Sequence, residues 1–264
     1  MKPILQIQGV SKNFGGLRAL QDISFDINQN EIIGLIGPNG AGKTTLFNCV
    51  AGIERPSSGK ILFTVNGNPV AIGGKKPEKV TALGIARTFQ NIRLFDNLKV
   101  LDNVKIGRHC RFKSNVFGAA FKTPSQRREE EEIAASAEEI LEFVGLRGRG
   151  EEIASSMAYG DQRRLEIARA LATDPKLLML DEPAAGMNPQ EARSLMDLIH
   201  RIRDKGITVL LIEHDMKVVM GICERVVVIN YGRMLMTGLP REVQGDPRVI
   251  EAYLGTGAFN AAEA

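Results

Sequence analysis

Residues 33–45 decide the fold of this chain: Ile-Gly-Leu-Ile-Gly-Pro-Asn-Gly-Ala-Gly-Lys-Thr-Thr. The stretch reads as an apolar strand, a glycine-rich loop and the opening turn of a helix. Within it, Gly37 to Thr44 fills every fixed position of the eight-residue phosphate-loop pattern. Glycines let backbone N–H groups curl around a polyphosphate, and the helix starting near Lys43 points its free N–H groups at the same anion. The stretch therefore predicts a phosphate-binding site on an α/β core.

Two side chains of this loop have separate expected roles. Lys43 should reach the β- and γ-phosphates of a nucleotide, and the Thr44 hydroxyl should hold Mg²⁺. The residues expected to bind the nucleotide are Gly37, Pro38, Asn39, Gly40, Ala41, Gly42, Lys43, Thr44 and Thr45. The alternative is a glycine-rich turn that happens to precede a helix, and it accounts poorly for a pattern with every fixed position filled.

A second group of residues indicates hydrolysis of that nucleotide. Residues 177–182, Leu-Leu-Met-Leu-Asp-Glu, read as an apolar strand that ends in two adjacent carboxylates. Asp181 should hold Mg²⁺ together with Thr44, and Glu182 could polarise an attacking water as a general base. An acidic turn after a strand is ordinary loop chemistry, so this segment is informative only because the phosphate loop accompanies it.

Composition limits the class of protein. The 264 residues allow one large α/β domain or a core with a smaller subdomain. A net charge of +3 gives no general case for nucleic-acid binding. The three cysteines, Cys49, Cys110 and Cys223, lack metal-site spacing, and their odd number suits a reducing compartment. We see no signal-peptide pattern and no apolar run of membrane-spanning length.

Hydrophobic periodicity predicts alternating strands and helices at both ends of the chain. The expected strands are 3–8, 20–27, 31–36, 60–65, 177–180, 207–212 and 225–229. The expected helices are 43–51, 124–144, 189–205 and 216–222. Thr123 and Asn188 are the expected N-caps of the second and third helices, each followed by a proline. The stretch 91–173 looks mostly helical, which predicts an α/β core interrupted by a helical subdomain.

In this order, the motifs resemble those of the ATP-binding subunits of ABC transporters, over about residues 4–254. The matching segments are the Walker A loop at 37–45, the Q-loop at 87–90, the Walker B strand at 177–182, the D-loop at 185–188 and the switch segment at 212–215. Gln90 and His214 match the functional residues of the Q-loop and the switch segment. Phe14 occupies the place of the aromatic residue that stacks on adenine in this family.

The resemblance implies an α/β fold of the ABC type. This fold has a P-loop (RecA-like) core, an N-terminal antiparallel β subdomain and a helical subdomain. The core would span about 4–90 and 174–254, the helical subdomain about 91–173, and a flexible tail 255–264. ATP and Mg²⁺ are the implied cofactors. The implied catalytic residues are Glu182, His214 and Gln90, and the implied metal ligands are Thr44, Gln90 and Asp181.

The signature segment, residues 157–161, departs from the usual Leu-Ser-Gly-Gly-Gln of this family and reads Met-Ala-Tyr-Gly-Asp. In the family this segment completes the nucleotide site of the partner in a head-to-tail dimer. Ala158 lacks the serine hydroxyl that contacts the γ-phosphate, so backbone N–H groups near Gly160 and the positive end of the next helix remain. The residues expected to contact the partner's nucleotide are Ala158, Tyr159, Gly160 and Asp161.

Three longer strings, at 87–95, 158–169 and 249–255, resemble one subgroup: bacterial importers for branched-chain amino acids. That subgroup also handles related hydrophobic amino acids, amides and urea. It implies a second ABC ATPase subunit as partner, for which we favour a heterodimer. It also implies two transmembrane permease subunits and, indirectly, a solute-binding protein. The chain would then be a peripheral subunit on the cytoplasmic face of the cell membrane, with no nucleic-acid partner.

The permease is expected to dock near residues 91–100. Phe95, Leu98 and Val100 are candidate apolar contacts there, although each could equally belong to the core of the helical subdomain. Three other functions stay open: an ABC ATPase of translation or DNA repair, the ATPase of lipopolysaccharide export, and a phosphotransferase. We see neither a second nucleotide domain nor a long coiled-coil insertion, the altered signature argues against lipopolysaccharide export, and Glu182 with His214 suits water activation.

Overall fold

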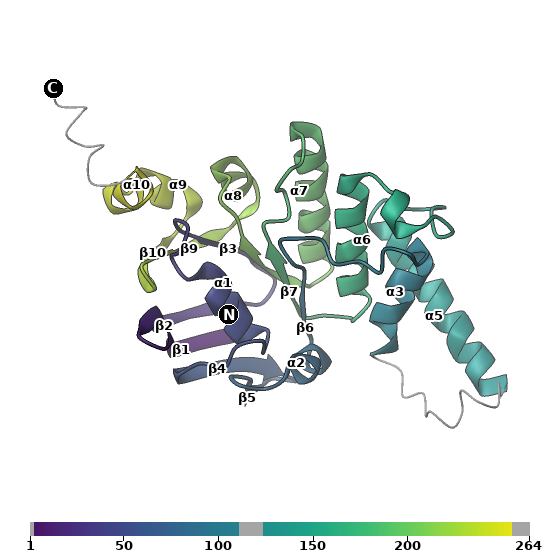
Figure 1. The fold of residues 1–264 in the computed structure, drawn as a ribbon, viewed down its shortest axis with the longest axis horizontal. Coiled ribbons are helices and arrows are strands. Elements are labelled where there is room, and N and C mark those ends of the chain that lie inside the picture. The colour runs from purple at the N-terminus through teal and green to yellow at the C-terminus, as the bar shows by residue number, and fades with distance from the viewer. Residues whose placement is uncertain (1–2, 111–123, 255–264) are drawn as a thin grey trace.

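The computed structural model describes residues 3–110 and 124–254, which form two β-sheets and a set of helices (Figure 1). The first sheet is antiparallel, with the strand order β2-β1-β4-β5. Its strands are β1 (Pro3–Phe14), β2 (Leu17–Asn28), β4 (Ser58–Val65) and β5 (Asn68–Ala71). The turn between β1 and β2 lies at Gly15 and Gly16, the only two residues that separate these strands.

The second sheet has six strands in the order β10-β9-β3-β8-β7-β6, and all neighbours except β10 and β9 run parallel. Its strands are β3 (Ile32–Ile36), β6 (Ile85–Arg87), β7 (Leu177–Asp181), β8 (Thr208–Ile212), β9 (Arg225–Asn230) and β10 (Arg233–Gly238). Parallel strands end at the same edge, so the segments that follow β3, β7 and β8 lie together. This edge carries the predicted phosphate loop, the acidic pair and the switch segment.

Helices cover the second sheet, and some of them lie to one side of it. They are α1 (Lys43–Val50), α2 (Pro77–Leu83), α3 (Val100–His109), α5 (Pro124–Phe143), α6 (Tyr159–Leu171), α7 (Pro189–Asp204), α8 (Met216–Ile222), α9 (Pro240–Gly245) and α10 (Pro247–Leu254), with one 3₁₀ turn at Ala154–Ser156. Figure 1 shows α3, α5 and α6 gathered at the end away from β10 and the C-terminus. Within the described ranges, no helix is long and apolar enough to cross a membrane.

The parallel sheet has a hydrophobic core on each face. Along β3, Ile33 and Leu35 belong to the core shared with α1 and the antiparallel sheet, whereas Ile32 and Ile36 belong to the core shared with α6, α7 and α8. Successive side chains of a strand point to opposite faces, so a strand covered on both sides reads as a continuous apolar run. The sheet therefore lies between two packed layers, and the phosphate loop follows β3 at its edge.

The expected α/β class with a separate antiparallel sheet and a helical part is confirmed. Asn188 caps α7 as expected, because its side chain accepts hydrogen bonds from the N–H groups of Gln190 and Glu191. The Thr123 cap and the 255–264 tail lie outside the described residues. The exact division between core and helical subdomain stays a prediction.

Candidate nucleotide site

The phosphate loop runs from β3 to α1, and its first and last glycines allow a close approach of neighbouring backbone. A Cβ on Gly37, which has φ 152°, would overlap the carbonyl oxygen of Ile229 in β9. A Cβ on Gly42, at φ 103°, would lie 2.6 Å from the carbonyl oxygen of Ala19 in β2. The two glycines are therefore required by packing against both sheets as well as by access for a phosphate.

The turn between β9 and β10 supports this loop from the side. The N–H of Gly232 donates to the carbonyl oxygen of Ala41 at 2.9 Å, and the N–H of Gln21 donates to the carbonyl oxygen of Gly232 at 2.7 Å. One turn thus links the loop to β2 by backbone hydrogen bonds. These bonds fix the position of the loop relative to the antiparallel sheet.

A cleft of about 580 Å³ opens above the loop, within the size range of small-ligand sites. The predicted residues that line it are Phe14, Asn39, Gly40, Ala41, Gly42, Lys43, Thr44, Thr45, Gln90 and Glu182. Leu17, Arg18, Ala19, Gln21, Tyr231 and Gly232 also line it and were not predicted. They come from β2 and from the β9–β10 turn, and no motif marks them in the sequence. The cleft therefore joins both sheets.

Lys43 lies inside this cleft with its ammonium held by the loop itself. Its Nζ donates to the carbonyl oxygens of Gly37 at 2.5 Å and Pro38 at 3.0 Å. Burial lowers the pKa of Lys43, while the nearby carboxylates of Glu182 and Asp181 act in the opposite direction. A buried ammonium beside a helix N-terminus gives this end of the cleft the charge needed for a polyphosphate.

Phe14 presents an aromatic ring to the same cleft. The ring is exposed, and the Nζ of Lys12 lies 4.6 Å from its centroid. Lys12 is held there by an ion pair with Glu54 at 2.7 Å. A cation on one face of a ring leaves the other face available for stacking on a planar group such as a nucleobase.

Asp181 is buried at the end of β7 and has a partner that sequence reasoning missed. The guanidinium of Arg87 donates to Oδ2 of Asp181 at 2.9 Å and to Oδ1 of Asn48 at 2.5 Å. Burial raises the pKa of Asp181, and Arg87 opposes this shift. Arg87 lies 94 residues away along the chain, so only the pairing of β6 with β7 brings the two together.

The oxygen chemistry of the predicted metal ligands fits Mg²⁺. Thr44 supplies a hydroxyl, Asp181 a carboxylate and Gln90 an amide carbonyl, and Mg²⁺ prefers oxygen ligands with few protein carboxylates. Among the described residues, no group of three or more His, Cys, Asp or Glu side chains could hold a metal ion. A site of this kind needs nucleotide oxygens and water to complete its coordination.

The three predicted catalytic side chains meet at Glu182. Nε2 of Gln90 donates to Oε2 of Glu182 at 3.0 Å, and Nδ1 of His214 lies 3.5 Å from the same oxygen. Glu182 has φ 46°, a left-handed conformation that is unusual for a residue with a side chain. Strained residues of this kind often mark functional sites.

The predicted signature residues begin α6 and do not line this chain's own cleft. Downstream in the same helix, Arg163 donates to the carbonyl oxygens of Phe89 at 2.6 Å and Gln90 at 2.7 Å. Arg163 also pairs with Glu166 at 2.8 Å, and both side chains are buried. Sequence reasoning missed this pair, which connects α6 to the Gln90 loop.

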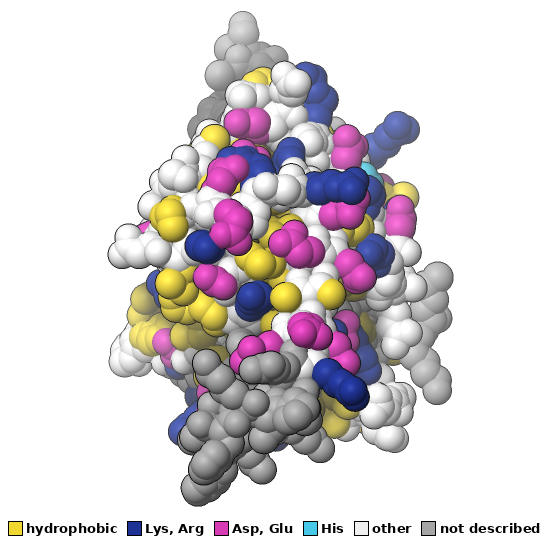
Figure 2. Space-filling model, turned by 90° about the vertical axis from the view of Figure 1, so that its right-hand side faces the viewer, with side chains coloured by type: hydrophobic (Ala, Val, Ile, Leu, Met, Phe, Trp, Pro, Cys, Tyr) yellow, Lys and Arg dark blue, Asp and Glu magenta, His cyan; other side chains and the backbone are white. Residues whose placement is uncertain are grey.

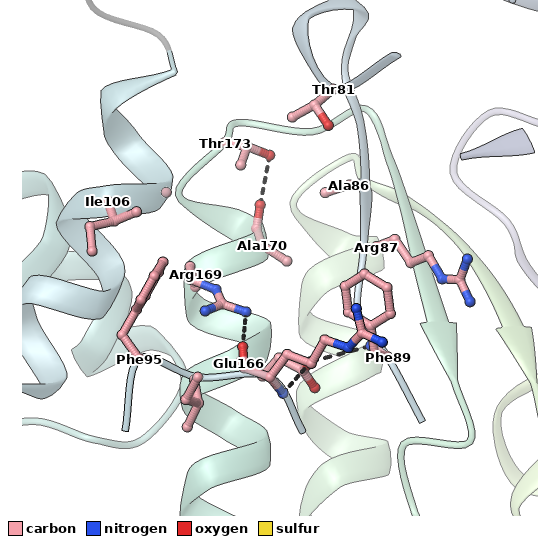
Figure 3. A pocket seen from close by; sticks show the side chains of 13 residues that line it. Thr81, Ala86, Arg87, Phe89, Phe95, Ile106, Glu166, Arg169, Ala170 and Thr173 are labelled. Atoms are coloured by element: carbon pink, nitrogen blue, oxygen red, sulfur yellow. Dashed lines mark hydrogen bonds between the residues drawn. The ribbon is translucent and has the colours of Figure 1, made fainter. Parts of the chain in front are cut away.

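A groove of about 470 Å³ lies between α2, α3, α6 and the segment after β6 (Figure 3). Phe95 lines it and is 46% exposed, and nearby Leu98 is 39% exposed. Of the two alternatives left open for Val100, the structure shows the core, because Val100 is fully buried at the start of α3. Figure 3 shows Phe95 and Ile106 on one side of the groove and Phe89 on the other.

Two family models match the chain. The model described as "ABC transporter" matches residues 20–185. The model described as "Branched-chain amino acid ATP-binding cassette transporter" matches residues 233–258. The first match contains the phosphate loop, the Q-loop and the Walker B strand, and the second begins at the first residue of β10.

Individual proteins are similar over nearly the full length. The chain is 45% identical to the "High-affinity branched-chain amino acid transport ATP-binding protein LivG" of Escherichia coli (strain K12), over 96% of this chain and 98% of that protein. It is 44% identical, over the same shares, to the protein BraF of the same description from Pseudomonas aeruginosa. Among solved structures, the ADP conformation of MJ1267, an ATP-binding cassette of an ABC transporter, superimposes with a TM-score of 0.84 at 32% identity, covering 97% of this chain and 100% of that one.

Proposed function

The chain belongs to the ABC transporter family and is an ATPase of the ABC type, and on this premise we propose that it powers an importer for branched-chain amino acids. The observation that carries the proposal is the similarity over 96% of the chain to transport ATPases of that class, together with the family match at residues 233–258. Sequence strings at 87–95, 158–169 and 249–255 support the same subgroup.

In the proposed reaction, the loop N–H groups and Lys43 bind the triphosphate while the exposed face of the Phe14 ring stacks on adenine. Glu182 takes a proton from the attacking water, and Gln90 and His214 keep its carboxylate in place. Thr44, Asp181 and Gln90 would hold Mg²⁺, which supplies positive charge to the phosphate oxygens. The product ADP and phosphate leave when the site opens.

Each nucleotide site would be completed by a second ATPase subunit in a head-to-tail dimer. The N-terminus of α6 offers backbone N–H groups to the partner's nucleotide, and Ala158 contributes no hydroxyl there. This difference from the usual signature favours a heterodimer in which the partner brings a different signature. ATP binding would close the dimer, and hydrolysis would reopen it.

We further propose that the groove beside α3 and α6 receives a cytoplasmic segment of a permease. Phe95 exposes apolar surface in the groove, Leu98 exposes apolar surface close to Phe95, and Phe89 connects the groove to the Gln90 loop. Figure 2, which looks at this end of the molecule, shows hydrophobic side chains gathered in a patch and charges of both signs elsewhere. Such a mixed surface suits a protein partner and gives no support for nucleic acid. Docking would place the chain at the cytoplasmic face of the cell membrane.

Importers of amides or urea and the lipopolysaccharide exporter are the competing assignments within the same family. The match at 233–258 to the branched-chain amino acid family favours import of such amino acids. Co-purification with tagged chromosomal permeases tests the assignment. We expect two permeases and a second short ATPase to be recovered, and deletion of this chain to abolish uptake of labelled leucine. Recovery of ribosomes, DNA or an outer-membrane assembly would contradict the importer function.

A further inference from the structure

Glu213 is a buried carboxylate with no role in the mechanism above. It follows β8 directly, and only 1% of the residue is exposed. Oε1 accepts a hydrogen bond from the N–H of Ala184 at 3.1 Å, and Oε2 accepts one from the N–H of His214 at 3.2 Å. Burial raises the pKa of Glu213, and hydrogen bonds from backbone N–H groups, including that of Asp215, oppose the shift. A side chain this buried needs such partners to remain ionised.

These hydrogen bonds join the two loops that carry the proposed catalytic residues. Ala184 lies two residues after Glu182 in the loop that follows β7, and His214 follows Glu213 in the loop after β8. The two strands are adjacent and parallel, with Asp181 opposite Ile212. The carboxylate of Glu213 therefore links both loops at the edge of the sheet, because each of its oxygens accepts a hydrogen bond from a different loop.

Glu182 needs such support because its own backbone is strained. A left-handed conformation, here φ 46°, is unfavourable for a non-glycine residue and persists only where the surroundings impose it. The N–H of Glu182 donates to the carbonyl oxygen of Ile212 at 3.0 Å, which fixes the residue on its N-terminal side. On the C-terminal side, the bond from Ala184 to Glu213 holds the turn.

We propose that Glu213 is a positioning residue that holds Glu182 in its left-handed conformation with His214 beside it, so that the carboxylate of Glu182 faces the cleft. The inference rests on the proposed role of Glu182 as the base. It requires two acceptor oxygens on residue 213. Glutamine has the same shape but only one acceptor, and its NH₂ group would face a backbone N–H. Glu213→Gln therefore breaks one of the two links without a change of volume.

The experiment measures single-turnover ATP hydrolysis per bound nucleotide in the full chain, so that a poorly folded fraction does not affect the rate. We expect Glu213→Gln to lower this rate at least tenfold, since small misplacements of catalytic groups are costly. The dissociation constant for ATP without Mg²⁺ should stay within about threefold, because the phosphate loop is supported separately. Glu213→Asp keeps two acceptors on a shorter side chain and should recover part of the rate. Glu224→Gln, an exposed carboxylate that is paired with Arg203, is the matched control.

A double-mutant cycle separates positioning from a merely structural role. If Glu213 acts through Glu182, then adding Glu213→Gln to Glu182→Gln should slow the residual hydrolysis by no more than about twofold. An equal loss in both backgrounds, or a Glu213→Gln rate within threefold of wild type, would overturn the inference. If Glu182→Gln alone retains wild-type turnover, the proposed base is wrong, and that outcome is distinct from a failure at Glu213.

Discussion

At the scale of single residues, the first and last glycines of the phosphate loop are needed both for packing and for phosphate binding. Gly37 and Gly42 are usually explained by the phosphate that they admit. Here each also faces a carbonyl oxygen from a different sheet. The loop thus needs glycine at these two positions before any ligand is present.

Gly37→Ala should therefore destabilise the chain as well as remove nucleotide binding. The new Cβ overlaps the Ile229 carbonyl oxygen, so backbone must shift, and we expect a loss in the free energy of unfolding of about 3 kcal/mol or more, in the range of other severe packing defects. Gly67→Ala is the control, since its Cβ meets nothing within 4 Å and only the left-handed φ costs about 1–2 kcal/mol. Urea denaturation compares the two variants. Equal losses would show that the loop can shift without cost.

The sequence could predict the residues that lie within short motifs, and it missed their distant partners. Two short segments could be interpreted from their residue order alone, because that order is typical of phosphate and metal binding. They contain Lys43, Thr44, Asp181 and Glu182. Arg87 contacts Asp181, which lies 94 positions away in the chain, because β6 pairs with β7. Nothing near Arg87 in the chain shows that its guanidinium will reach a carboxylate.

At the scale of elements, α6 and the Gln90 loop form one unit joined by a buried ion pair. Arg163 binds Glu166 in its own helix and two carbonyl oxygens of the loop. The N–H groups of Phe89 and Arg93 donate to Glu166 in return. Burial raises the pKa of Glu166, and Arg163 is the main opposing influence. The helix that begins with the signature is thereby tied to the residue that touches Glu182.

Arg163→Met should leave Glu166 buried without its cation, at a cost of about 3–5 kcal/mol in the free energy of unfolding. Arg147→Met is a matched control, because Arg147 and its partner Glu142 are both exposed, and it should leave the unfolding midpoint unchanged. Chemical denaturation followed by circular dichroism measures both variants. A midpoint for Arg163→Met as high as that of the control would show that the pair contributes little.

Element types were predicted better than their ends and surroundings. The strand at 20–27 was recognised from its alternation, and the structure extends it to Leu17–Asn28 because pairing with β1 continues past the apolar residues. The sequence left open whether Val100 is a surface contact or part of the core, and the structure shows that this first residue of α3 is buried. Sequence periodicity near a helix start does not show which side faces the core.

At the scale of the whole molecule, the proposed dimer gives the chain one half of each of two nucleotide sites. Its own cleft has the phosphate loop and Glu182, whereas residues Ala158 to Asp161 begin α6 and do not line that cleft. In the proposed head-to-tail dimer, a second subunit would bring a signature to this loop, and this chain's signature would serve the loop of the second subunit.

Purified alone, the chain should bind Mg-ATP and hydrolyse it at least tenfold more slowly than the assembled transporter. The physical reason is that transition-state contacts from a partner's signature are missing. Steady-state phosphate release over a range of chain concentrations measures this. A rate per chain that equals that of the assembled transporter at every concentration would contradict the heterodimer.

The support of the phosphate loop from both sheets has a mechanical consequence. Carbonyl oxygens from β2 and β9 limit the loop at either end, and Gly232 donates a hydrogen bond to its Ala41. Because the phosphate loop is held by these three contacts, we expect it to stay fixed relative to both sheets. If the chain drives a permease as proposed, we expect the displacement to come from rotation of α3, α5 and α6 about the Gln90 segment, relative to a fixed phosphate loop.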